Sequence, residues 1–557
     1  MPASANAAIY YLPDMADTSR PKLMGRHAAG EGFLAAFARH AEVERFYCCA
    51  AERAHAEDFA RRMGEAGGKH ETVWVRRTAQ ARIGKIGCLF VGEPRLSGYA
   101  FARRAAGNRS YSLCGLTHTL SGADIGRGIG DLLLGPVQPW DAVICTTEAA
   151  RRVGLRLLDN WQDYLAERLG AASFTRPMLP VIPLGVDTQA YAAGPKADQA
   201  RRNWRQKIGA GDEDIVILFF GRLSFHAKAN PLPMYLAAER AAQTSGRRLH
   251  LVQAGWFAND FIENAFRDAA RVLCPSVNAV FLDGRLPEVR YTIWHAADIF
   301  TSLSDNIQET FGLTPIEAMA TGLPVVASDW DGYRDTLTDG RTALLVPTIM
   351  PPAGLGAVLA QELETGGLSY DRYIGAAAHA IAVDVPATAE AYGRLIADAN
   401  LRRRLGAAGR KEARRRFDWR VIVRAYQELW GEMAALRAGA PESAPRRPDR
   451  PANPLNEDPF ALFAHFATRA LREDDLIAAA PGADAAALNR LGALALNKPP
   501  FETGVGPETV AAALARLAAG PMRVAELLDG FPAGDRQGLH LALLWLIKCD
   551  LVRTAGD

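Results

Sequence analysis

Short apolar runs alternate with longer stretches of helical periodicity along most of the chain. The runs are AIYYL, VWV, CLFVG, YSLCGL, AVICT and LPVIPL in the first part, then IVILFFG, LHLVQAG, AVFLDG, ADIFTSL, LPVVAS and ALLVP. Such alternation is typical of βαβ units, in which helices cover both faces of a parallel sheet. The two series meet at residues 183–202, so the pattern predicts two doubly wound α/β domains, residues 1–195 and 196–437.

The pattern changes after Pro347, where the chain is helical in periodicity to about Arg437. This part includes the arginine-rich run LRRRLGAAGRKEARRRFDWR. A basic run of this kind is either a solvated helical face or a surface that binds anionic lipid. Acidic and apolar residues interrupt the run, which favours the solvated face and leaves peripheral membrane contact as the alternative.

Residues 438–457, AGAPESAPRRPDRPANPLNE, are rich in Pro, Ala and Arg and have no periodic apolar positions. This composition predicts a stiff, solvated linker. Residues 458–557 would then form a mainly helical accessory module, which could end as helix, turn, helix and short hairpin, as in a winged-helix module. From Pro451 onward the chain carries 9 Lys and Arg against 13 Asp and Glu. We therefore expect a protein contact through this module and no nucleic acid.

Composition narrows the class of protein further. The chain has 557 residues and a formal net charge of +2, which gives no general reason to expect a nucleic-acid partner. Its seven cysteines are scattered and never spaced as C-x-x-C, which argues against a disulfide framework or a zinc site. The first residues do not resemble a secretory signal, and no apolar run approaches the ~20 residues of a membrane span. We expect a cytoplasmic protein.

The candidate chemistry begins with ETFGLTPIEAMATGLPVV, which contains Glu309 and Glu317. Thr314 before a proline and Glu317 three residues later form a capping-box pattern. One interpretation is therefore that Glu317 only caps the start of a short helix. The turn TFGLT, with Gly312 at its centre, would let the backbone approach a ligand, and the amides at the helix start suit a phosphate. Glu309 could then accept hydrogen bonds from sugar hydroxyls.

The strand IVILFF runs into GRLSFHAKANP, which places Gly221, Arg222 and Lys228 at the carboxyl end of a strand. Open parallel sheets bind ligands at this edge. The guanidinium fork and the ammonium point charge could converge on a diphosphate. A diphosphate flanked by hydroxylated rings is a nucleotide sugar.

These two stretches, GRLSFHAKANP and ETFGLTPIEAMATGLPVVASDWDGYRDTL, resemble the donor-binding half of the family-four retaining glycosyltransferases, which have the GT-B fold of two facing Rossmann-like domains. VIPLGVDTQAY is similar to the family's interdomain segment, and the resemblance extends from about residue 7 to 435. It implies that Glu309 contacts the donor sugar and Glu317 the ribose. It also implies that two cations, Arg222 and Lys228, hold the diphosphate. The remaining donor-binding candidates are Gly221, Phe311, Gly312, Leu313 and Thr314.

Two candidates lie in the first domain. YSLCGLTHTLSG predicts a strand followed by a loop that carries His118, which could be a structural or a catalytic group; the resemblance implies that it lies beside the reacting sugar. PKLMGRHAAGEGFLAAF fits neither a P-loop nor the dinucleotide fingerprint. It predicts a flexible loop before a helix capped near Glu31. The resemblance implies a mobile loop near the donor phosphate and the acceptor, with Arg26 and Gly30 as candidates.

Together these features predict a retaining glycosyltransferase that uses a UDP- or GDP-sugar, with no bound cofactor and no obligatory metal. The acceptor would be a glycan, a lipid-linked sugar or a small molecule in glycan or glycolipid biosynthesis. One alternative is a sugar-nucleotide epimerase or hydrolase with the glutamates as acid and base. Another is a catalytically silent nucleotide-sugar-binding scaffold that recruits partners through residues 458–557.

Overall fold

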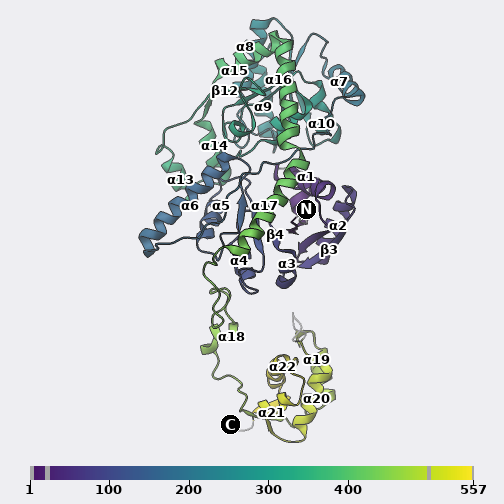
Figure 1. The fold of residues 1–557 in the computed structure, drawn as a ribbon, viewed down its shortest axis with the longest axis vertical. Coiled ribbons are helices and arrows are strands. Elements are labelled where there is room, and N and C mark those ends of the chain that lie inside the picture. Colours follow the sequence, from purple (N-terminus) through teal and green to yellow (C-terminus); the bar gives the residue numbers. More distant parts are fainter. Residues whose placement is uncertain (1–4, 19–24, 498–503, 555–557) are drawn as a thin grey trace. The chain divides into compact units, whose positions relative to one another are not determined.

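The structure is a computed structural model that describes residues 5–18, 25–497 and 504–554 (Figure 1). The chain forms two compact units, Met1–Pro454 and Leu455–Asp557. The first unit contains two Rossmann-like α/β domains, as the apolar pattern predicted. The second unit is a small module of helices and short strands.

The N-terminal sheet has six parallel strands in the order β3-β2-β1-β4-β5-β6, which is the doubly wound order. Its strands are β1 (Ala8–Tyr10), β2 (Arg45–Ala50), β3 (Glu71–Arg76), β4 (Cys88–Phe90), β5 (Ser112–Leu116) and β6 (Ala142–Ile144). The predicted run LPVIPL makes only isolated bridges beside β6. The sequence reading missed β2, because its letters RFYCCA do not form an obvious apolar run, although most of its side chains are buried.

Helices cover this sheet on both faces. They are α1 (Gly25–His40), α2 (Arg53–Glu65), α3 (Gln80–Ile86), α4 (Ser97–Arg104), α5 (Ala123–Gly130) and α6 (Glu148–Leu169), with short 3-10 turns at Pro13–Ala16 and Asp131–Leu133. The α6 helix begins at a hydroxyl cap, because the side chain of Thr147 accepts a hydrogen bond from Ala150 N.

The second sheet repeats the same topology, with the order β12-β11-β10-β7-β8-β9. Its strands are β7 (Ile215–Phe220), β8 (Leu249–Gly255), β9 (Asn278–Asp283), β10 (Ile299–Ser302), β11 (Val325–Ser328) and β12 (Ala343–Val346). Its helices are α7 (Pro195–Ile208), α8 (Leu232–Ser245), α9 (Asp260–Leu273), α10 (Pro287–Thr292) with the 3-10 turn Ile293–Ala296, α11 (Leu313–Thr321), α12 (Tyr333–Thr336), α15 (Val385–Ala397) and α16 (Ala399–Glu412). Each of the six apolar runs predicted here forms a strand, so this part of the prediction is confirmed.

A small insertion separates β12 from α15. It consists of β13 (Thr348–Ile349), α13 (Ala357–Glu364), α14 (Tyr370–His379) and β14 (Ala382–Val383). The strands β13 and β14 pair antiparallel and close the base of the insertion. The insertion contacts the N-terminal domain, because Arg127 of α5 pairs with Glu364 of α13 at 3.0 Å and Ser121 lies 2.7 Å from the hydroxyl of Tyr370 in α14.

The last helix of this unit, α17 (Trp419–Gly439), belongs with the N-terminal domain, which corrects the predicted donor domain of residues 196–437. Its Tyr426 packs against Phe33 and Phe90, with ring centroids 5.4 and 5.5 Å apart. The chain returns to this domain beside its first crossing, where Val186 N donates to Phe417 O and Trp419 N donates to Val186 O. A periodic apolar face shows that a helix is buried but does not show which sheet buries it.

The arginine-rich run spans α16 and a π-helical turn, Ala413–Phe417. Glu412 pairs with Arg415 at 2.7 Å and with Arg341 at 3.1 Å. Arg410 donates to Thr321 O at the end of α11. Several of the arginines therefore stabilise the donor domain itself, and no helix in the described ranges is both long and apolar enough to span a bilayer.

The predicted solvated linker is attached to the N-terminal domain over much of its length. Asn108 donates to Glu442 Oε1 at 2.8 Å, Ser443 exchanges two hydrogen bonds of 2.9 Å with Gln138, and Arg104 donates to Ala452 O at 3.2 Å. Side-chain amides thus satisfy the backbone of a segment that has no apolar periodicity of its own, which a composition-based prediction does not detect.

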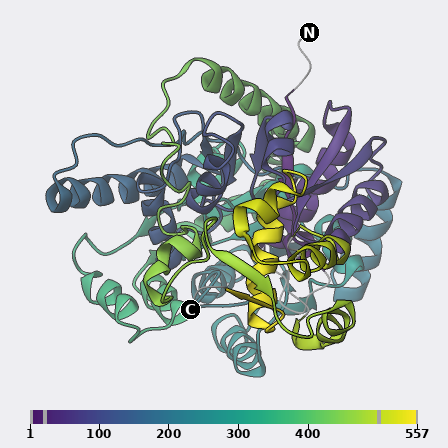
Figure 2. The same cartoon turned by 90° about the horizontal axis from the view of Figure 1, so that it is seen from below.

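The C-terminal unit contains α18 (Pro459–Leu462), a 3-10 turn (Ala464–Phe466), β15 (Leu476–Ala479), α19 (Ala485–Ala493), a second turn (Ala495–Asn497), α20 (Pro507–Ala518), β16 (Met522–Arg523), α21 (Val524–Asp529), α22 (Arg536–Lys548) and β17 (Val552–Thr554). Figure 2 shows these elements in yellow and yellow-green. β15 pairs antiparallel with both β16 and β17. The predicted helix-turn-helix is present in α21 and α22. The predicted final hairpin is wrong for the described residues, because β17 pairs with the distant β15.

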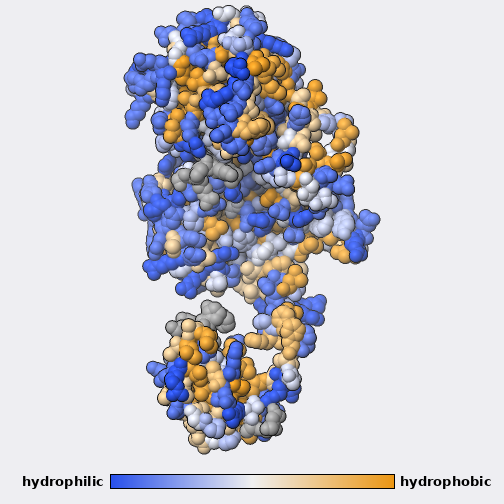
Figure 3. Space-filling view, turned by 180° about the vertical axis from the view of Figure 1, so that it is seen from behind, coloured by the Kyte–Doolittle hydropathy of each residue, from blue (hydrophilic) through white to orange (hydrophobic). Residues whose placement is uncertain are grey.

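Large apolar side chains are exposed at many places along the described chain, including the insertion and the C-terminal unit. Ile349, Met350, Leu355 and Val358 are 60–73% exposed in the insertion, and Phe460 and Phe466 are 71% and 75% exposed in the C-terminal unit. Figure 3 shows hydrophobic residues lying between hydrophilic ones on one face of the molecule. Isolated apolar side chains of this kind are common on protein surfaces.

Candidate functional site

A pocket of about 340 Å³ lies between the two Rossmann-like domains, where loops that follow the strands of both sheets meet. This is within the usual size of small-molecule sites and at the edge where parallel sheets bind ligands. The lining residues lie within the segments 25–29, 117–119, 220–228, 255–256, 284–290 and 308–317, together with Thr146 and Leu184. The structure thus brings together most of the predicted residues, including Arg222, Lys228, Glu309, Glu317 and His118.

The helix α11 starts at the pocket with Gly312 as its N-cap residue. Gly312 has φ of 82°, and a Cβ atom there would lie 2.1 Å from the ring of Tyr333, so only glycine fits. The predicted capping box is wrong: Thr314 lies inside the helix, and no side chain caps its start. The left-handed glycine allows the helix to begin at Leu313, and the first backbone amides of α11 are free of helical partners.

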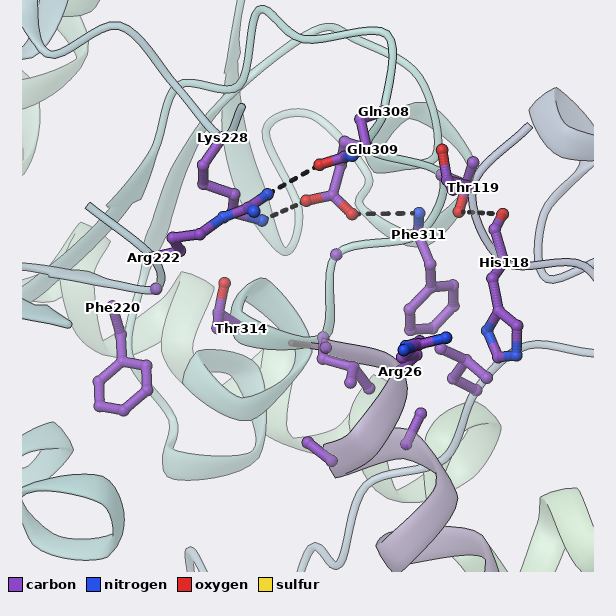
Figure 4. A pocket seen from close by; sticks show the side chains of 18 of the residues that line it. Arg26, His118, Thr119, Phe220, Arg222, Lys228, Gln308, Glu309, Phe311 and Thr314 are labelled. Carbon is purple, nitrogen blue, oxygen red and sulfur yellow. Dashed lines mark hydrogen bonds and ion pairs between the residues drawn. The ribbon is translucent and has the colours of Figure 1, made fainter. Parts of the chain in front are cut away.

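Glu309 and Lys228 form an ion pair between the loop before α11 and the loop after β7 (Figure 4). The two side chains are 15% and 17% exposed. Burial alone would raise the pKa of Glu309, but the ammonium of Lys228 outweighs it and holds that pKa below its ordinary value. Burial alone would lower the pKa of Lys228, and Glu309 raises it instead. Both groups are therefore charged at neutral pH.

Arg222 points into the same space from the end of β7 (Figure 4). Its Nη2 atom donates to Ala227 O and to Gln308 Oε1, both at 2.7 Å. Within the described part of the chain, no hydrogen bond is formed by its Nε and Nη1 atoms. Burial lowers the pKa of Arg222, but an arginine remains charged at any ordinary pH. The guanidinium is held by one edge and presents the other to the pocket.

Glu317 lies one turn into α11, where Tyr191 donates to its Oε1 atom at 2.8 Å. Burial raises the pKa of Glu317, although Tyr191 and Arg290 oppose the shift. Thr314 also lines the pocket, and its Oγ1 atom is buried without a hydrogen-bond partner in the described structure. Figure 4 shows the Thr314 side chain on the same side as Arg222 and Lys228.

His118 faces the pocket from the N-terminal domain (Figure 4). Its Nε2 atom lies 2.9 Å from Gly92 O, so Nε2 carries a proton in that contact and Nδ1 is left as an acceptor. Burial lowers the pKa of His118 below its ordinary value, so the imidazole is neutral at pH 7. Its backbone oxygen accepts from Thr310 Oγ1 at 3.1 Å, which joins the two domains beside the site.

The predicted glycine loop is largely helical. Gly25 already begins α1, so Arg26 and Gly30 lie in its first turns and not in a mobile loop; residues 21–24 of the predicted segment lie outside the described residues. Arg26 lines the pocket and forms a weak pair with Asp14 at 3.7 Å. Gly30 has another role, because a Cβ atom there would lie 2.2 Å from Met15 O. Close packing against the backbone explains that glycine.

Residues 214–361 match the model of a family described as Glycosyl transferases group 1. This segment is therefore similar to the group 1 glycosyltransferases. The matched segment contains the donor-domain residues described above, from Gly221 to Glu317, whereas His118 and Arg26 lie outside it.

Two curated relatives illustrate this similarity. It is 31% identical over 208 residues to the D-inositol 3-phosphate glycosyltransferase of Corynebacterium efficiens, a match that covers 36% of this chain and 48% of the relative. It is 29% identical over 193 residues to the enzyme of the same name from Nocardia farcinica, covering 34% and 41%. The chain thus spans less than half the length of these relatives.

Among solved structures, the chain is similar to Anabaena Alr3699/HepE in complex with UDP. The TM-score is 0.48 at 15% identity, and the match covers 77% of this chain and 100% of that one.

The sequence reading missed several residues of the site. Gln308 contacts Arg222, and Arg290 lies near Glu317 and pairs with Glu31 at 3.4 Å. Neither residue belongs to a motif with a recognisable spacing, so the sequence did not mark them. They become visible only when the fold brings loops from different strands together.

Asp331 is another residue without a sequence signal. It has φ of 49°, and its Oδ2 atom is buried without a hydrogen-bond partner in the described structure. Burial, with a smaller contribution from Glu309, raises the pKa of Asp331 to about 8. Because the folded pKa lies above the unfolded one, this carboxyl group destabilises the fold progressively as the pH rises from about 4 to about 8.

Asp331→Asn should therefore stabilise the protein, by on the order of 1–3 kcal/mol at pH 9 and by less at pH 5. Asparagine tolerates the left-handed backbone and carries no charge. Thermal unfolding at both pH values measures the effect. Asp329→Asn is the control, since Asp329 is 39% exposed and should show no such pH-dependent gain. Equal midpoints for Asp331→Asn and the wild type at pH 9 would contradict the prediction.

Proposed function

We propose that this protein is a retaining glycosyltransferase that moves a sugar from a nucleotide diphosphate sugar to a hydroxyl group of an acceptor. The observation that carries the proposal is the meeting of Arg222, Lys228 and the start of α11 with two carboxylates in one interdomain pocket. Cations and helix amides suit a diphosphate, while carboxylates suit the hydroxyl groups on either side of it. The similarity of residues 214–361 to the group 1 glycosyltransferases supports the same reaction class.

In the proposed reaction, the bond between the anomeric carbon and the phosphate oxygen breaks, and negative charge develops on the departing diphosphate. The free edge of Arg222 and the amides of Leu313 and Thr314 would stabilise that charge without reorganisation. Lys228 would contribute its positive charge from the Glu309 pair. These groups would supply the neutralising charge, so the proposal requires no divalent metal ion.

The two carboxylates would hold the rings at opposite ends of the donor. Glu309 would accept hydrogen bonds from the transferred sugar, and Glu317, already positioned by Tyr191, would accept them from the ribose. His118 would face the reacting sugar from the N-terminal domain, with Nδ1 as an acceptor. The acceptor would enter from that side, on the face that the diphosphate leaves, without a protein nucleophile.

Isothermal titration with UDP- and GDP-sugars, with and without magnesium, tests this proposal. We expect one class of nucleotide sugar to bind with a dissociation constant on the order of 1 µM to 1 mM, and to bind without magnesium. Arg222→Met should weaken binding at least about tenfold, which corresponds to about 1.4 kcal/mol. Arg240→Met is the control, because Arg240 is exposed on α8, away from the pocket lining. Mass spectrometry of the released nucleotide then identifies the donor.

A wild-type protein that binds none of the nucleotide sugars, in either buffer, would overturn the proposal. Binding that depends entirely on magnesium would overturn its metal-independent form.

A further inference from the structure

The insertion between β12 and α15 places one tyrosine at the junction of the two domains. Tyr370 is the first residue of α14, and its hydroxyl oxygen makes three polar contacts. Gln308 Nε2 donates to it at 3.0 Å, Ser121 Oγ lies 2.7 Å away, and Thr119 Oγ1 lies 3.4 Å away. Ser121 and Thr119 belong to the N-terminal loop after β5, whereas Gln308 belongs to the donor domain.

These contacts form a chain with a defined direction. Arg222 can only donate, so Gln308 must turn its carbonyl oxygen towards Arg222 and its amide towards Tyr370. Tyr370 has a single hydroxyl proton, and Ser121 Oγ is its shortest contact. Ser121 Oγ lies 3.1 Å from Thr119 Oγ1, which extends the chain to the neighbour of His118. The positive charge of Arg222 polarises every bond in this sequence.

The chain joins two groups that the proposed reaction needs in fixed positions. One end is the guanidinium expected to bind the diphosphate, and the other is the loop that carries His118 (Figure 4). A second link between the insertion and the N-terminal domain, Arg127 with Glu364, is 64% and 67% exposed and therefore weak. Tyr370 is partly buried and bonded on both sides, which makes its hydroxyl the stronger connection.

We propose that Tyr370 is a positioning residue that fixes Arg222 and the loop 117–122 relative to each other. It thereby couples the donor phosphate site to the N-terminal side of the pocket. The inference rests on the proposed function. Tyr370 is not itself one of the pocket-lining residues and touches no reacting atom; it acts through Gln308 on Arg222 and through Ser121 on the His118 loop. Its loss should therefore impair turnover more than donor binding, because Arg222 keeps its charge and its bond to Ala227.

Tyr370→Phe tests the proposal, since it removes only the hydroxyl group. We expect kcat for sugar transfer to fall about tenfold, while the dissociation constant of the nucleoside diphosphate changes by less than about threefold. Tyr373→Phe is the matched control on the same helix, because no hydrogen bond of the Tyr373 hydroxyl is found in the described structure; its kcat should stay within about twofold of the wild type. An unchanged kcat in Tyr370→Phe would overturn the proposal.

A double-variant cycle separates coupling from a local structural effect. Ser121→Ala removes the next hydrogen bond after Tyr370 in the series. The kcat of the double variant should therefore lie within about twofold of the kcat of Tyr370→Phe alone. Losses that simply multiply would mean that the two hydroxyl groups act independently, and would overturn the coupling.

Hydrogen exchange provides a readout that does not depend on turnover. Without nucleotide, the amides of residues 117–122 should exchange faster in Tyr370→Phe than in the wild type, and those of α9 should not change. If the amides of residues 117–122 exchange at the same rate in both proteins, Tyr370 does not hold this loop and the proposal is overturned. If the wild type turned over no nucleotide sugar, the proposed function would fail, while the exchange experiment would still decide whether Tyr370 anchors this loop.

Discussion

Glu309→Gln is expected to lower sugar transfer by on the order of 10²- to 10³-fold, the largest effect on activity that the structure predicts. The carboxylate would bind sugar hydroxyl groups and holds Lys228 in the pocket through a pair that is largely shielded from solvent. A neutral amide keeps the shape of the side chain but loses both the charge and half of its acceptor capacity. Steady-state release of nucleoside diphosphate measures the loss.

The same substitution leaves the ammonium of Lys228 without its partner. Breaking a buried ion pair in this way lowers the free energy of unfolding by on the order of 3–5 kcal/mol. Activity is therefore normalised to the folded fraction, determined by circular dichroism at the assay temperature. Glu213→Gln is the control, because Glu213 is 85% exposed and forms a surface pair with Arg247. If the normalised rate of sugar transfer by Glu309→Gln lay within about threefold of the wild-type rate, Glu309 would have no role in the reaction.

Asp141→Asn should destabilise the N-terminal domain by about 3–5 kcal/mol, a loss as large as that expected from breaking the Glu309 pair. Asp141 and Arg103 are both 0% exposed and form a two-pronged pair, with N–O distances of 2.6 and 2.8 Å. The same carboxylate accepts from Leu113 N at the start of β5 and from Gln138 N, both at 2.8 Å. An amide would turn its NH₂ group towards one of these donors and leave Arg103 as an uncompensated buried charge.

Urea unfolding followed by circular dichroism gives the change in the free energy of unfolding of Asp141→Asn. Asp159→Asn is the matched control, because Asp159 is 59% exposed in its pair with Arg176, and such pairs contribute about 0–1 kcal/mol. Equal unfolding midpoints for Asp141→Asn and the wild type would show that the buried pair does not stabilise the sheet.

The donor sheet could be predicted from sequence because its strands are buried on both faces, and such strands have continuous apolar sequences. The strand β2 was missed for the opposite reason: its run begins with Arg45, which is exposed, and continues through two cysteines. The helix α17 was assigned to the wrong domain because its apolar stripe is equally suited to either sheet. Local patterns predict that an element is buried, and tertiary contacts decide where.

The candidate site divides in the same way. Residues close together in the chain, such as Arg222 with Lys228, were identified by their shared place after one strand. The start of α11 was misread, because the Thr314 pattern for capping is local, whereas the packing of Tyr333 against Gly312 is not. Tyr370 lies 62 residues from Gln308, so no sequence spacing could have connected them.

The paired crossings at Val186 and Phe417 mean that the N-terminal domain is not one continuous stretch of polypeptide. A fragment that stops near residue 195 would expose the aromatic face on which Tyr426 and Trp430 rest. Production of this domain by itself therefore requires residues 419–439 as well, either as a complementing peptide or joined through a circular permutation. The donor domain, by contrast, is bounded by the two crossings and can be excised as a single piece.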